Sequence, residues 1–534
     1  MSTSLFQIAN SNYFGSGSIG FGTVVSKFGR VAGRSGVTIE PENESISRAY
    51  ETMSLYNPII ALIPGAISAS SIFTLYSTRG ERVNIAQTAG TQSRIDKAGN
   101  IVIERATNLP RITFPSGSGG NKNAAFLIEP IRTNLIGNNN FISWTPGASA
   151  SYSTGSLLGI TCANISVNSD LSTNGISSPG SGAYRVSHAP TAYSRLFYSA
   201  SVYAVSWLYQ PLNTNAQNTS SACFINLISG SYSENMTVTA NLGTGGVTGT
   251  STDSKILFVT GSVELFPLGN TNRTYRIAAA FTTSRNDTIG NQLTCSVFAF
   301  GFPSTIYSSP TTASGAFVAP QIELISAPGA IGSATIFQPT SYIPALDTAA
   351  TSTRNASVIT ITTASDSGVF SASLADLSNE GTVYIEFLPS PIISVSSSPN
   401  ERYLTSFYQG NGGGSPNNAR MEFNLSNLTP RITFNYNSNS TSSAGTRAGV
   451  DNRVNKVAYT WKTNSTRSAY INGVLSATSS QNHPYTSWEA IRIGAYISSN
   501  SDVCNMPIYA IAFYDRALTN DQLANLTSTS SISI

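Results

Sequence analysis

Short apolar stretches alternate with turn-forming clusters along almost the whole 534-residue chain. Candidate strands include residues 193–209, 273–283 and 293–302, and clusters of Gly, Asn and Ser separate them. No helical periodicity lies between these stretches. The pattern therefore predicts an all-β protein built of sandwiches or jelly rolls.

A hairpin is predicted near the C-terminus, where VNKVAYTWKTNSTRSAYINGVLSA contains two strands around the turn KTNST. In the first strand, Val457, Tyr459 and Trp461 fall on one face, and Ala458 and Thr460 fall on the other. This alternation is the period that a strand imposes, so the segment is expected to pair with the one that follows it.

One helix is predicted, and it is short. It lies at residues 516–526, in the segment RALTNDQLANL. Thr519 is placed to accept from the backbone of the first turn, and Gln522 follows at the spacing of a capping box.

Changes in composition divide the chain into five parts. Residues 1–54 are rich in Gly and Ser and then acidic, with little apolar periodicity, so they are interpreted as an attachment arm that becomes ordered on another body. Short β-like pieces at 55–137 form a β connector, and the long β region at 138–345 forms a first sandwich. Polar residues at 346–356 form a hinge into a second sandwich at 357–534.

The stretch AFLIEPIRTNL, residues 125–135, interrupts an apolar run with Glu129 and Arg132 around Pro130. A strand passing through a core does not favour such charges, so we expect a structural connector. In this interpretation an ion pair and the proline set the direction of the chain at a domain junction or against a neighbouring subunit. The alternative is an exposed turn, because most surface ion pairs contribute little.

The composition and net charge limit the classes of ligand that the protein is expected to bind. Charged residues make up 10% of the chain, against about 25% in an ordinary soluble domain. Their place is taken by uncharged polar residues, and 43 Gly, 24 Tyr and 24 Phe suit strands and tight turns. The net charge is +3, and Lys and Arg are scattered, so nucleic acid is not an expected partner.

No cofactor and no metal site are expected. The four cysteines are Cys162, Cys223, Cys295 and Cys504; they lie far apart, without the spacing of a metal site, and are expected as buried free thiols. The two histidines, His188 and His483, fall in different predicted domains, which disfavours catalysis by histidine.

The sequence contains no basic and then apolar leader at its N-terminus and no run of 18 apolar residues, so neither a secretory signal nor a membrane span is expected. The protein is then made in a cytoplasm. Weakly charged, Asn- and Ser-rich β sequence is nevertheless typical of surfaces exposed outside cells. A particle that assembles inside a cell and is released by lysis satisfies both observations.

A block of motifs in the connector carries a family resemblance. The segments LYNPIIALIPGA, TRG, SRIDKAGNIVIE, LPRITF, AAFLIEPIRTNL and FISW, in order over residues 55–145, resemble a block common in bacteriophage tail and appendage proteins. The chain departs from that pattern at Phe114, where Tyr is frequent, and it lacks the usual Ser-Thr after Gly80.

Two further stretches resemble modules of the same proteins. The segment that contains Gln321, Glu323, residues 340–344 and Arg354 is similar to the closing strand of a carbohydrate-binding-module-like jelly roll, which assigns that fold to 138–345. The segments NKVAYTWKT, SAYINGVLSAT, AIRIGAY and PIYAIAFYDRALTNDQLANL resemble a concanavalin-A-like, or laminin-G-like, sandwich. The resemblance thus implies tandem β-sandwiches after an extended N-terminal arm and a β connector.

The resemblance implies a structural fibre or appendage protein of a bacteriophage virion, on head or tail, assembled in the host bacterial cytoplasm. Its expected partners are other virion proteins through residues 1–54, two further copies in a homotrimer, and a bacterial surface glycan bound by the last domain. Two alternatives stay open: a purely structural head or collar fibre without receptor binding, and a glycan depolymerase.

Sugars stack on aromatic rings, and this chemistry selects candidate residues. The glycan-binding candidates are Trp488, Tyr496, Tyr403, Tyr408 and Tyr470 in the last domain and Trp207 in the middle one. Each of these rings is alternatively a core residue. A glycosidase needs two carboxylates about 5–10 Å apart, and Glu386 and Glu422 stand isolated on predicted strands. The sequence therefore predicts a binding protein and not an enzyme.

Overall fold

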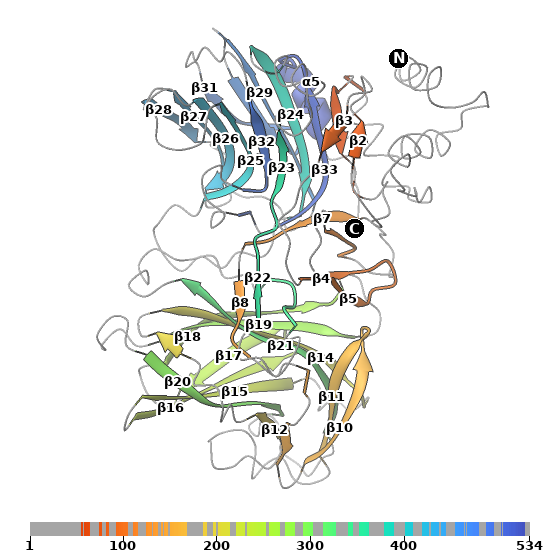
Figure 1. Ribbon diagram of the computed structural model, residues 1–534, viewed down its shortest axis with the longest axis vertical. Helices are drawn as coiled ribbons and strands as arrows, with labels where there is room; N and C mark the ends of the chain where they lie inside the picture. The colour runs from red at the N-terminus through yellow and green to blue at the C-terminus, as the bar shows by residue number, and fades with distance from the viewer. Residues whose placement is uncertain are drawn as a thin grey trace, which may run out of the picture.

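The computed structural model is built almost entirely of β-strands, and its single described helix lies near the C-terminus (Figure 1). The structure describes residues 55–56, 58–62, 64, 74–76, 82–84, 92–104, 111–115, 124–130, 132–136, 140–141, 144–147, 150–167, 185–188, 196–198, 201–213, 220–229, 232–251, 256–267, 273–283, 292–302, 313–326, 340–344, 352–362, 377, 379–388, 401–409, 419–426, 429–436, 439–444, 454–463, 465, 467–479, 488–495, 503–504 and 506–528.

The C-terminal sandwich consists of two sheets. Sheet I has the order β31-β30-β29-β24-β33-β7-β6, and β1 also pairs with β33. Its strands are β1 (Ile60–Leu62), β6 (Ile112–Thr113), β7 (Ala125–Ile128), β24 (Glu380–Phe387), β29 (Asn455–Lys462), β30 (Arg467–Ile471), β31 (Val474–Ser479) and β33 (Met506–Tyr514). Sheet II has the order β23-β32-β25-β26-β27-β28. Its strands are β23 (Ile359–Thr362), β25 (Glu401–Gln409), β26 (Ala419–Ser426), β27 (Thr429–Tyr436), β28 (Asn439–Ala444) and β32 (Ala490–Ile493).

The middle sandwich also consists of two sheets. Sheet III has the order β10-β11-β21-β14-β19-β18, with β8 paired to β21 and to β22. Its strands are β8 (Arg132–Asn134), β10 (Ala150–Leu157), β11 (Ile160–Val167), β14 (Val202–Pro211), β18 (Ile256–Leu265), β19 (Tyr275–Thr283), β21 (Ala313–Ser326) and β22 (Ser352–Arg354). Sheet IV has the order β17-β16-β15-β20-β12-β9, with β13 paired to β20. Its strands are β9 (Thr145–Pro146), β12 (Arg185–His188), β13 (Leu196–Tyr198), β15 (Ser220–Ser229), β16 (Tyr232–Asn241), β17 (Gly246–Ser251) and β20 (Gln292–Gly301).

Two small hairpins and one helix complete the described structure. The hairpins are β2 (Thr74–Tyr76) with β3 (Arg82–Asn84), and β4 (Gln92–Ile95) with β5 (Ile101–Glu104). The helix α5 (Asn520–Thr527) has Thr519 as its N-cap and both bonds of the predicted capping box. The all-β fold, the terminal helix and the hairpin of β29 and β30 are therefore confirmed.

The middle sandwich is inserted into the C-terminal one. Strands β1, β6 and β7 come from the predicted connector at 55–137, yet they extend sheet I along the open edge of β33. The chain then enters sheet III at β8, completes the middle sandwich, and returns from β22 to β23 in sheet II. The C-terminal sandwich is thus made of two chain segments, one on either side of the insertion (Figure 1).

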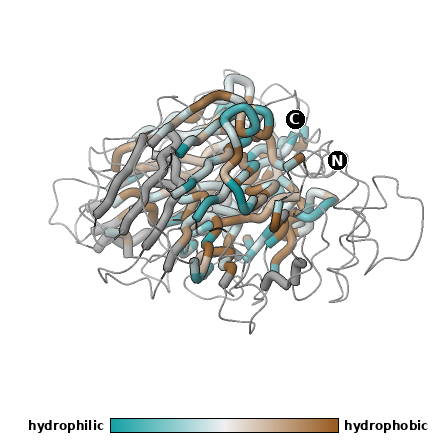
Figure 2. The backbone as a smooth tube through the Cα atoms, turned by 90° about the horizontal axis from the view of Figure 1, so that it is seen from above, coloured by the Kyte–Doolittle hydropathy of each residue, from teal (hydrophilic) through white to brown (hydrophobic). Residues whose placement is uncertain are grey.

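Each sandwich has its own apolar core, and both faces of β29 are buried, including Ala458 and Thr460. In the C-terminal core Val457, Tyr459 and Trp461 of β29 pack with Phe126 of β7 and Ile491 of β32. A separate core of the middle sandwich joins residues of sheets III and IV, with Trp207, Tyr209, Phe300 and Phe317 among its largest side chains. Hydrophobic and hydrophilic positions are interspersed along the described backbone when the molecule is viewed from above (Figure 2).

Three of the four cysteines lie among residues whose side chains the structure describes. Cys162, Cys223 and Cys504 are buried and free, as expected, and the side chain of Cys295 lies outside the described residues. Burial raises the pKa of the Cys223 thiol, which keeps it protonated and unreactive. No helix in the described part of the chain is long and apolar enough to cross a membrane.

Candidate functional site: a buried ion network between the sandwiches

The chain passes between the two sandwiches twice, and the two crossings run side by side. The first crossing leaves β7 at Glu129 and Pro130, and the second follows β22 to Ser357. Strands β8 and β22 pair in antiparallel fashion, with Arg132 opposite Arg354. The Ser357 N–H also donates to the Glu129 carbonyl oxygen at 2.8 Å. Two antiparallel segments therefore connect the sandwiches.

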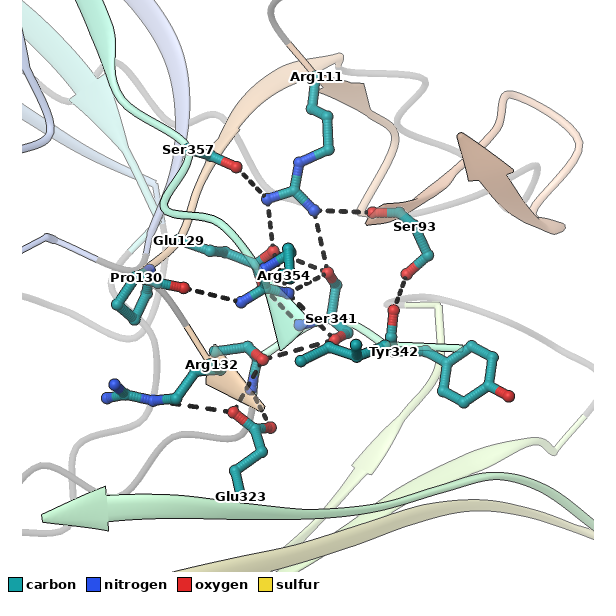
Figure 3. A network of polar contacts seen from close by, with 12 residues as sticks. Ser93, Arg111, Glu129, Pro130, Arg132, Glu323, Ser341, Tyr342, Arg354 and Ser357 are labelled. Atoms are coloured by element: carbon teal, nitrogen blue, oxygen red, sulfur yellow. Dashed lines mark hydrogen bonds and ion pairs between the residues drawn. The ribbon is translucent and has the colours of Figure 1, made fainter. Parts of the chain in front are cut away.

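A carboxylate between two guanidinium groups lies at the centre of these crossings. Glu129 Oε2 is 2.6 Å from Arg111 Nη2 and 3.0 Å from Arg354 Nη1. The Glu129 side chain is 3% exposed, and both arginine side chains are fully buried. A buried charge is tolerated only when it is paired and hydrogen-bonded, and the network around Glu129 meets both conditions (Figure 3).

Ser341 links all three ions. Its hydroxyl donates to Glu129 Oε2 at 2.7 Å, and its backbone N–H donates to Glu129 Oε1. The same hydroxyl accepts from Arg354 Nη1 at 2.9 Å and from Arg111 Nη1 at 3.1 Å. One small side chain thus contacts every charge of the cluster, which fixes the relative positions of the three ions.

Further terminal nitrogens of the two arginines donate to the backbone and hydroxyls of neighbouring segments. Arg111 Nη1 donates to the Ser93 carbonyl oxygen at 2.9 Å, and Arg111 Nη2 donates to the Ser357 hydroxyl at 2.7 Å. Arg354 Nη2 donates to the Pro130 carbonyl oxygen at 3.1 Å. The planar fork of each guanidinium therefore connects segments that are far apart in sequence.

The electrostatics keep this cluster charged. Burial by itself raises the pKa of Glu129, but the charges of Arg354 and Arg111 and two hydrogen bonds from Ser341 outweigh it and lower that pKa to about 2. Burial lowers the pKa of Arg111 to about 10, against the opposing effect of Glu129. Near neutral pH the carboxylate and the guanidinium are both ionised.

A second carboxylate is held on the middle-sandwich side. Glu323 of β21 is fully buried, and its two oxygens accept from the Thr340 N–H at 3.0 Å and the Thr340 hydroxyl at 2.9 Å. Gln321 Nε2 also donates to Glu323 Oε1. The Gln321 oxygen in turn accepts from the Ile343 N–H at 2.7 Å, so residues 340–343 are held against β21.

The expected ion pair between Glu129 and Arg132 is corrected by this arrangement. Arg132 Nε lies 3.8 Å from Glu323 Oε2, whereas Glu129 takes Arg111 and Arg354 as partners. The buried Pro130 lies between the two strands, so Glu129 directly follows a strand of one sandwich and Arg132 begins a strand of the other (Figure 3). The three connector residues thus lie at a junction of sandwiches, but with different ionic partners.

No ionic role was expected for Arg111, Ser341 or Arg354, although Arg111 lies in the motif LPRITF and the other two lie in the jelly-roll motif. The available signal was the same one that selected Glu129, namely a charged residue beside apolar positions of a strand, as Arg111 stands in LPRITF. Pattern alone does not tell which of these charges meet, because the partners Glu129 and Arg354 come from opposite ends of the inserted sandwich.

Four of the six aromatic glycan candidates are buried, which corrects their expected exposure. Trp488 and Trp207 are 2% and 1% exposed, and Tyr403 and Tyr470 are 6% and 7% exposed. A ring covered on both faces offers no platform for a sugar. Tyr496 lies outside the described residues, and Tyr408 lies in β25 with a side chain that is outside them as well.

Trp488 shows why the expectation failed. Its indole N–H donates to the Leu377 carbonyl oxygen at 2.9 Å, and the Trp461 indole N–H donates to the same oxygen at the same distance. The Phe407 ring lies 5.5 Å from the Trp488 ring and 5.4 Å from the Trp461 ring, centroid to centroid. Trp488 is therefore a core residue, although its sequence surroundings are those of a loop.

The two carboxylates considered for catalysis, Glu386 and Glu422, belong to strands of different sheets. Glu386 of β24 is 5% exposed and accepts a hydrogen bond from the Tyr384 hydroxyl. Glu422 belongs to β26 in the other sheet of the sandwich, and its side chain is outside the described residues, as is that of His188 in β12. His483 also lies outside them. Among the described residues no group of three or more His, Cys, Asp or Glu could hold a metal ion.

Comparisons with known proteins identify part of the C-terminal sandwich. Residues 393–524 match the family model of the concanavalin A-like lectin/glucanases superfamily. No curated protein matches the sequence.

Among solved structures, the sialidase carbohydrate-binding module CBM40 of Ruminococcus gnavus, bound to α2,3-sialyllactose, is 19% identical, with a TM-score of 0.25, over 29% of this chain and 86% of that chain. A heptameric SAP-like pentraxin of Limulus polyphemus is 16% identical, with a TM-score of 0.22, over 29% of this chain and 72% of that chain. The binding domain of botulinum neurotoxin serotype D is 16% identical, with a TM-score of 0.24, over 32% of this chain and 39% of that chain. The family match shows that the C-terminal sandwich contains a concanavalin A-like domain, which strands from upstream of the insertion complete.

Proposed function

We propose that the chain is a glycan-binding protein without catalytic activity of its own. The observation that carries this proposal is the match of residues 393–524 to the concanavalin A-like lectin/glucanases superfamily, in a sandwich whose sheets the structure describes. A lectin site recognises sugars by ring stacking and hydrogen bonds, and it needs no perturbed acid or base. The buried Glu386, bound by Tyr384, is interpreted as part of the sheet packing.

The finer proposal is a structural fibre or appendage of a bacteriophage virion that adheres to a host-surface glycan. The ordered motifs at residues 55–145 support it, because their pattern resembles appendage proteins. In this proposal residues 1–54 attach to other virion proteins, three copies associate, and the protein is located in the virion.

Tyr56, one of the first described residues, is hydrogen-bonded to the C-terminal sandwich. Arg516 Nη2 donates to the Tyr56 carbonyl oxygen at 2.9 Å, and Asn525 Nδ2 of α5 donates to the Tyr56 hydroxyl at 3.0 Å.

A glycan array probed with the full-length chain tests the proposed function. Binding to a bacterial polysaccharide that Tyr408→Ala or Tyr496→Ala weakens, with unchanged thermal stability, is the expected result. Absence of binding to all bacterial surface glycans tested would favour a purely structural fibre. Release of reducing ends from a bound polysaccharide, abolished by Glu386→Gln, would instead establish a depolymerase and overturn the proposal.

A further inference from the structure

We propose that the Glu129–Arg111–Arg354 cluster is an interdomain lock, which holds the two sandwiches in one orientation and makes them unfold as a single cooperative body. Two domains joined by one exposed linker usually move relative to one another. This chain has two crossings, and its charged groups are buried between them. The lock is a property of the junction and does not depend on what the protein binds.

The ionic contacts span the boundary. Glu129 follows β7 of sheet I, whereas Arg354 ends β22 of sheet III, so their 3.0 Å ion pair joins one sandwich to the other. Ser341 is attached to the middle sandwich through its neighbour Ile343, which donates to Gln321 of β21, and its hydroxyl donates to Glu129. A relative rotation of the sandwiches would separate these groups inside a volume that excludes water.

Separation would be costly because the charged groups are buried, where water does not replace a lost partner. Arg354 of β22 would leave the Glu129 carboxylate, whereas Arg111, which precedes β6 of sheet I, would stay with it. A buried guanidinium without a counter-ion is unfavourable. The two sandwiches therefore have one orientation in which every charge of the cluster is satisfied.

The β4–β5 hairpin braces the same junction from a third direction. On one side, the Phe114 N–H beyond β6 donates to the Ile95 carbonyl oxygen at 3.0 Å. On the other side, the Ile101 N–H donates to the Leu158 carbonyl oxygen at 2.7 Å, in the turn between β10 and β11. The Ile101 side chain packs with Leu208 of β14 and other apolar residues of the middle sandwich.

The brace is tied directly to the ion cluster. The Ser93 carbonyl oxygen of β4 accepts from Arg111, and the Ser93 hydroxyl donates to the Tyr342 carbonyl oxygen at 2.5 Å. A rotation of the sandwiches about the two crossings would thus break the hydrogen bonds that join Ser93 of the hairpin to Arg111 and Tyr342, as well as the ion pairs (Figure 3). The paired crossings and the hairpin thus hold the two sandwiches together at separate places, which opposes a hinge motion.

Thermal unfolding of the full-length chain tests the lock. The unfolding is monitored by calorimetry and by hydrogen exchange, with a peptide from β14 reporting on the middle sandwich and one from β29 on the C-terminal sandwich. For the natural protein we expect one transition, with both peptides losing protection together. For Glu129→Gln, which keeps the shape and removes the charge, we expect two transitions with midpoints separated by on the order of 5 °C. The matched control is Glu380→Gln, which removes the exposed pair of Glu380 with Lys462, and it should retain one transition.

Two results would overturn the proposal. One is independent unfolding of the two sandwiches in the natural protein. The other is a single shared transition in a folded Glu129→Gln variant. If Glu129→Gln does not fold, Arg354→Lys is tested in its place. Lysine keeps the positive charge, but its single ammonium group cannot contact Glu129 and the Pro130 carbonyl oxygen in the way that the two terminal nitrogens of Arg354 do. Separate transitions in that variant support the lock, and a single transition contradicts it.

Discussion

The Arg354 guanidinium donates from Nη2 to the backbone carbonyl oxygen of Pro130 at 3.1 Å. Proline has no backbone N–H, so its position in the first crossing is held through its ring and its carbonyl. The other arm of Arg354 lies 3.0 Å from the carboxylate of Glu129, the preceding residue. Arg354, in the second crossing, therefore binds two consecutive residues of the first crossing, Glu129 and Pro130.

The depressed pKa of Glu129 predicts how the junction responds to acid. Its value of about 2 in the folded protein, against an ordinary value of 4.5, means that the ionised carboxylate stabilises the folded state. This stabilisation, on the order of 3 kcal/mol, is fully present above about pH 4.5 and is lost as the pH falls toward 2.

Comparing unfolding free energies of the natural protein and Glu129→Gln isolates this effect, because other titrating groups contribute equally to both. We expect the difference to stay constant from pH 8 to pH 5 and to shrink steadily between about pH 4.5 and pH 2. A difference that grew as the pH fell, or that stayed the same down to pH 2.5, would contradict the role given to the carboxylate.

The insertion predicts that residues 357–534 do not form a stable domain alone. Removal of the upstream segments takes away β1 and β7, which pair with β33 at Ile60↔Phe513 and Phe126↔Ile508. A long apolar strand would then present an open edge, which is an aggregation hazard. We expect this fragment to be insoluble or to lack a cooperative transition in circular dichroism.

The control for truncation restores the missing strands. Joining residues 55–129 to 357–534 through a short glycine linker replaces the inserted sandwich, since the Ser357 N–H and the Glu129 carbonyl oxygen are only 2.8 Å apart. This fusion should be more soluble than the fragment 357–534 and should regain a β-sheet spectrum. Equal behaviour of the two would show that the upstream strands are not needed.

The fold followed from the sequence where local pattern decides structure. The alternation of Val457, Tyr459 and Trp461 and the capping box of Thr519 act within a few residues, and both are present in the structure. The ionic partners of Glu129 and the burial of Trp488 did not follow. Each depends on segments far away along the chain, and no local period shows which segments will meet.

Gly381 is expected to be intolerant of a side chain. A Cβ at this position of β24 would lie 2.3 Å from the Trp461 ring, which is buried and cannot move aside. Gly381→Ala should therefore destabilise the protein by about 1–3 kcal/mol, the usual cost of overpacking a core. The matched control is Gly246→Ala at the exposed start of β17, where the nearest atom would be 3.3 Å away. Urea unfolding should separate the two variants.

The position of Trp488 predicts that its replacement changes stability and not recognition. Trp488→Phe keeps an aromatic ring beside Phe407 but removes the hydrogen bond to the Leu377 carbonyl oxygen, so we expect a loss of about 1 kcal/mol. Trp488→Ala also empties a buried volume and should cost about 3–5 kcal/mol. Denaturant unfolding gives both values. Glycan binding, measured well below each unfolding midpoint, should be the same for Trp488→Phe as for the natural protein, because a buried ring has no face to offer a sugar. Selective loss of binding in a fully folded Trp488→Phe would show instead that the indole is reached by ligand.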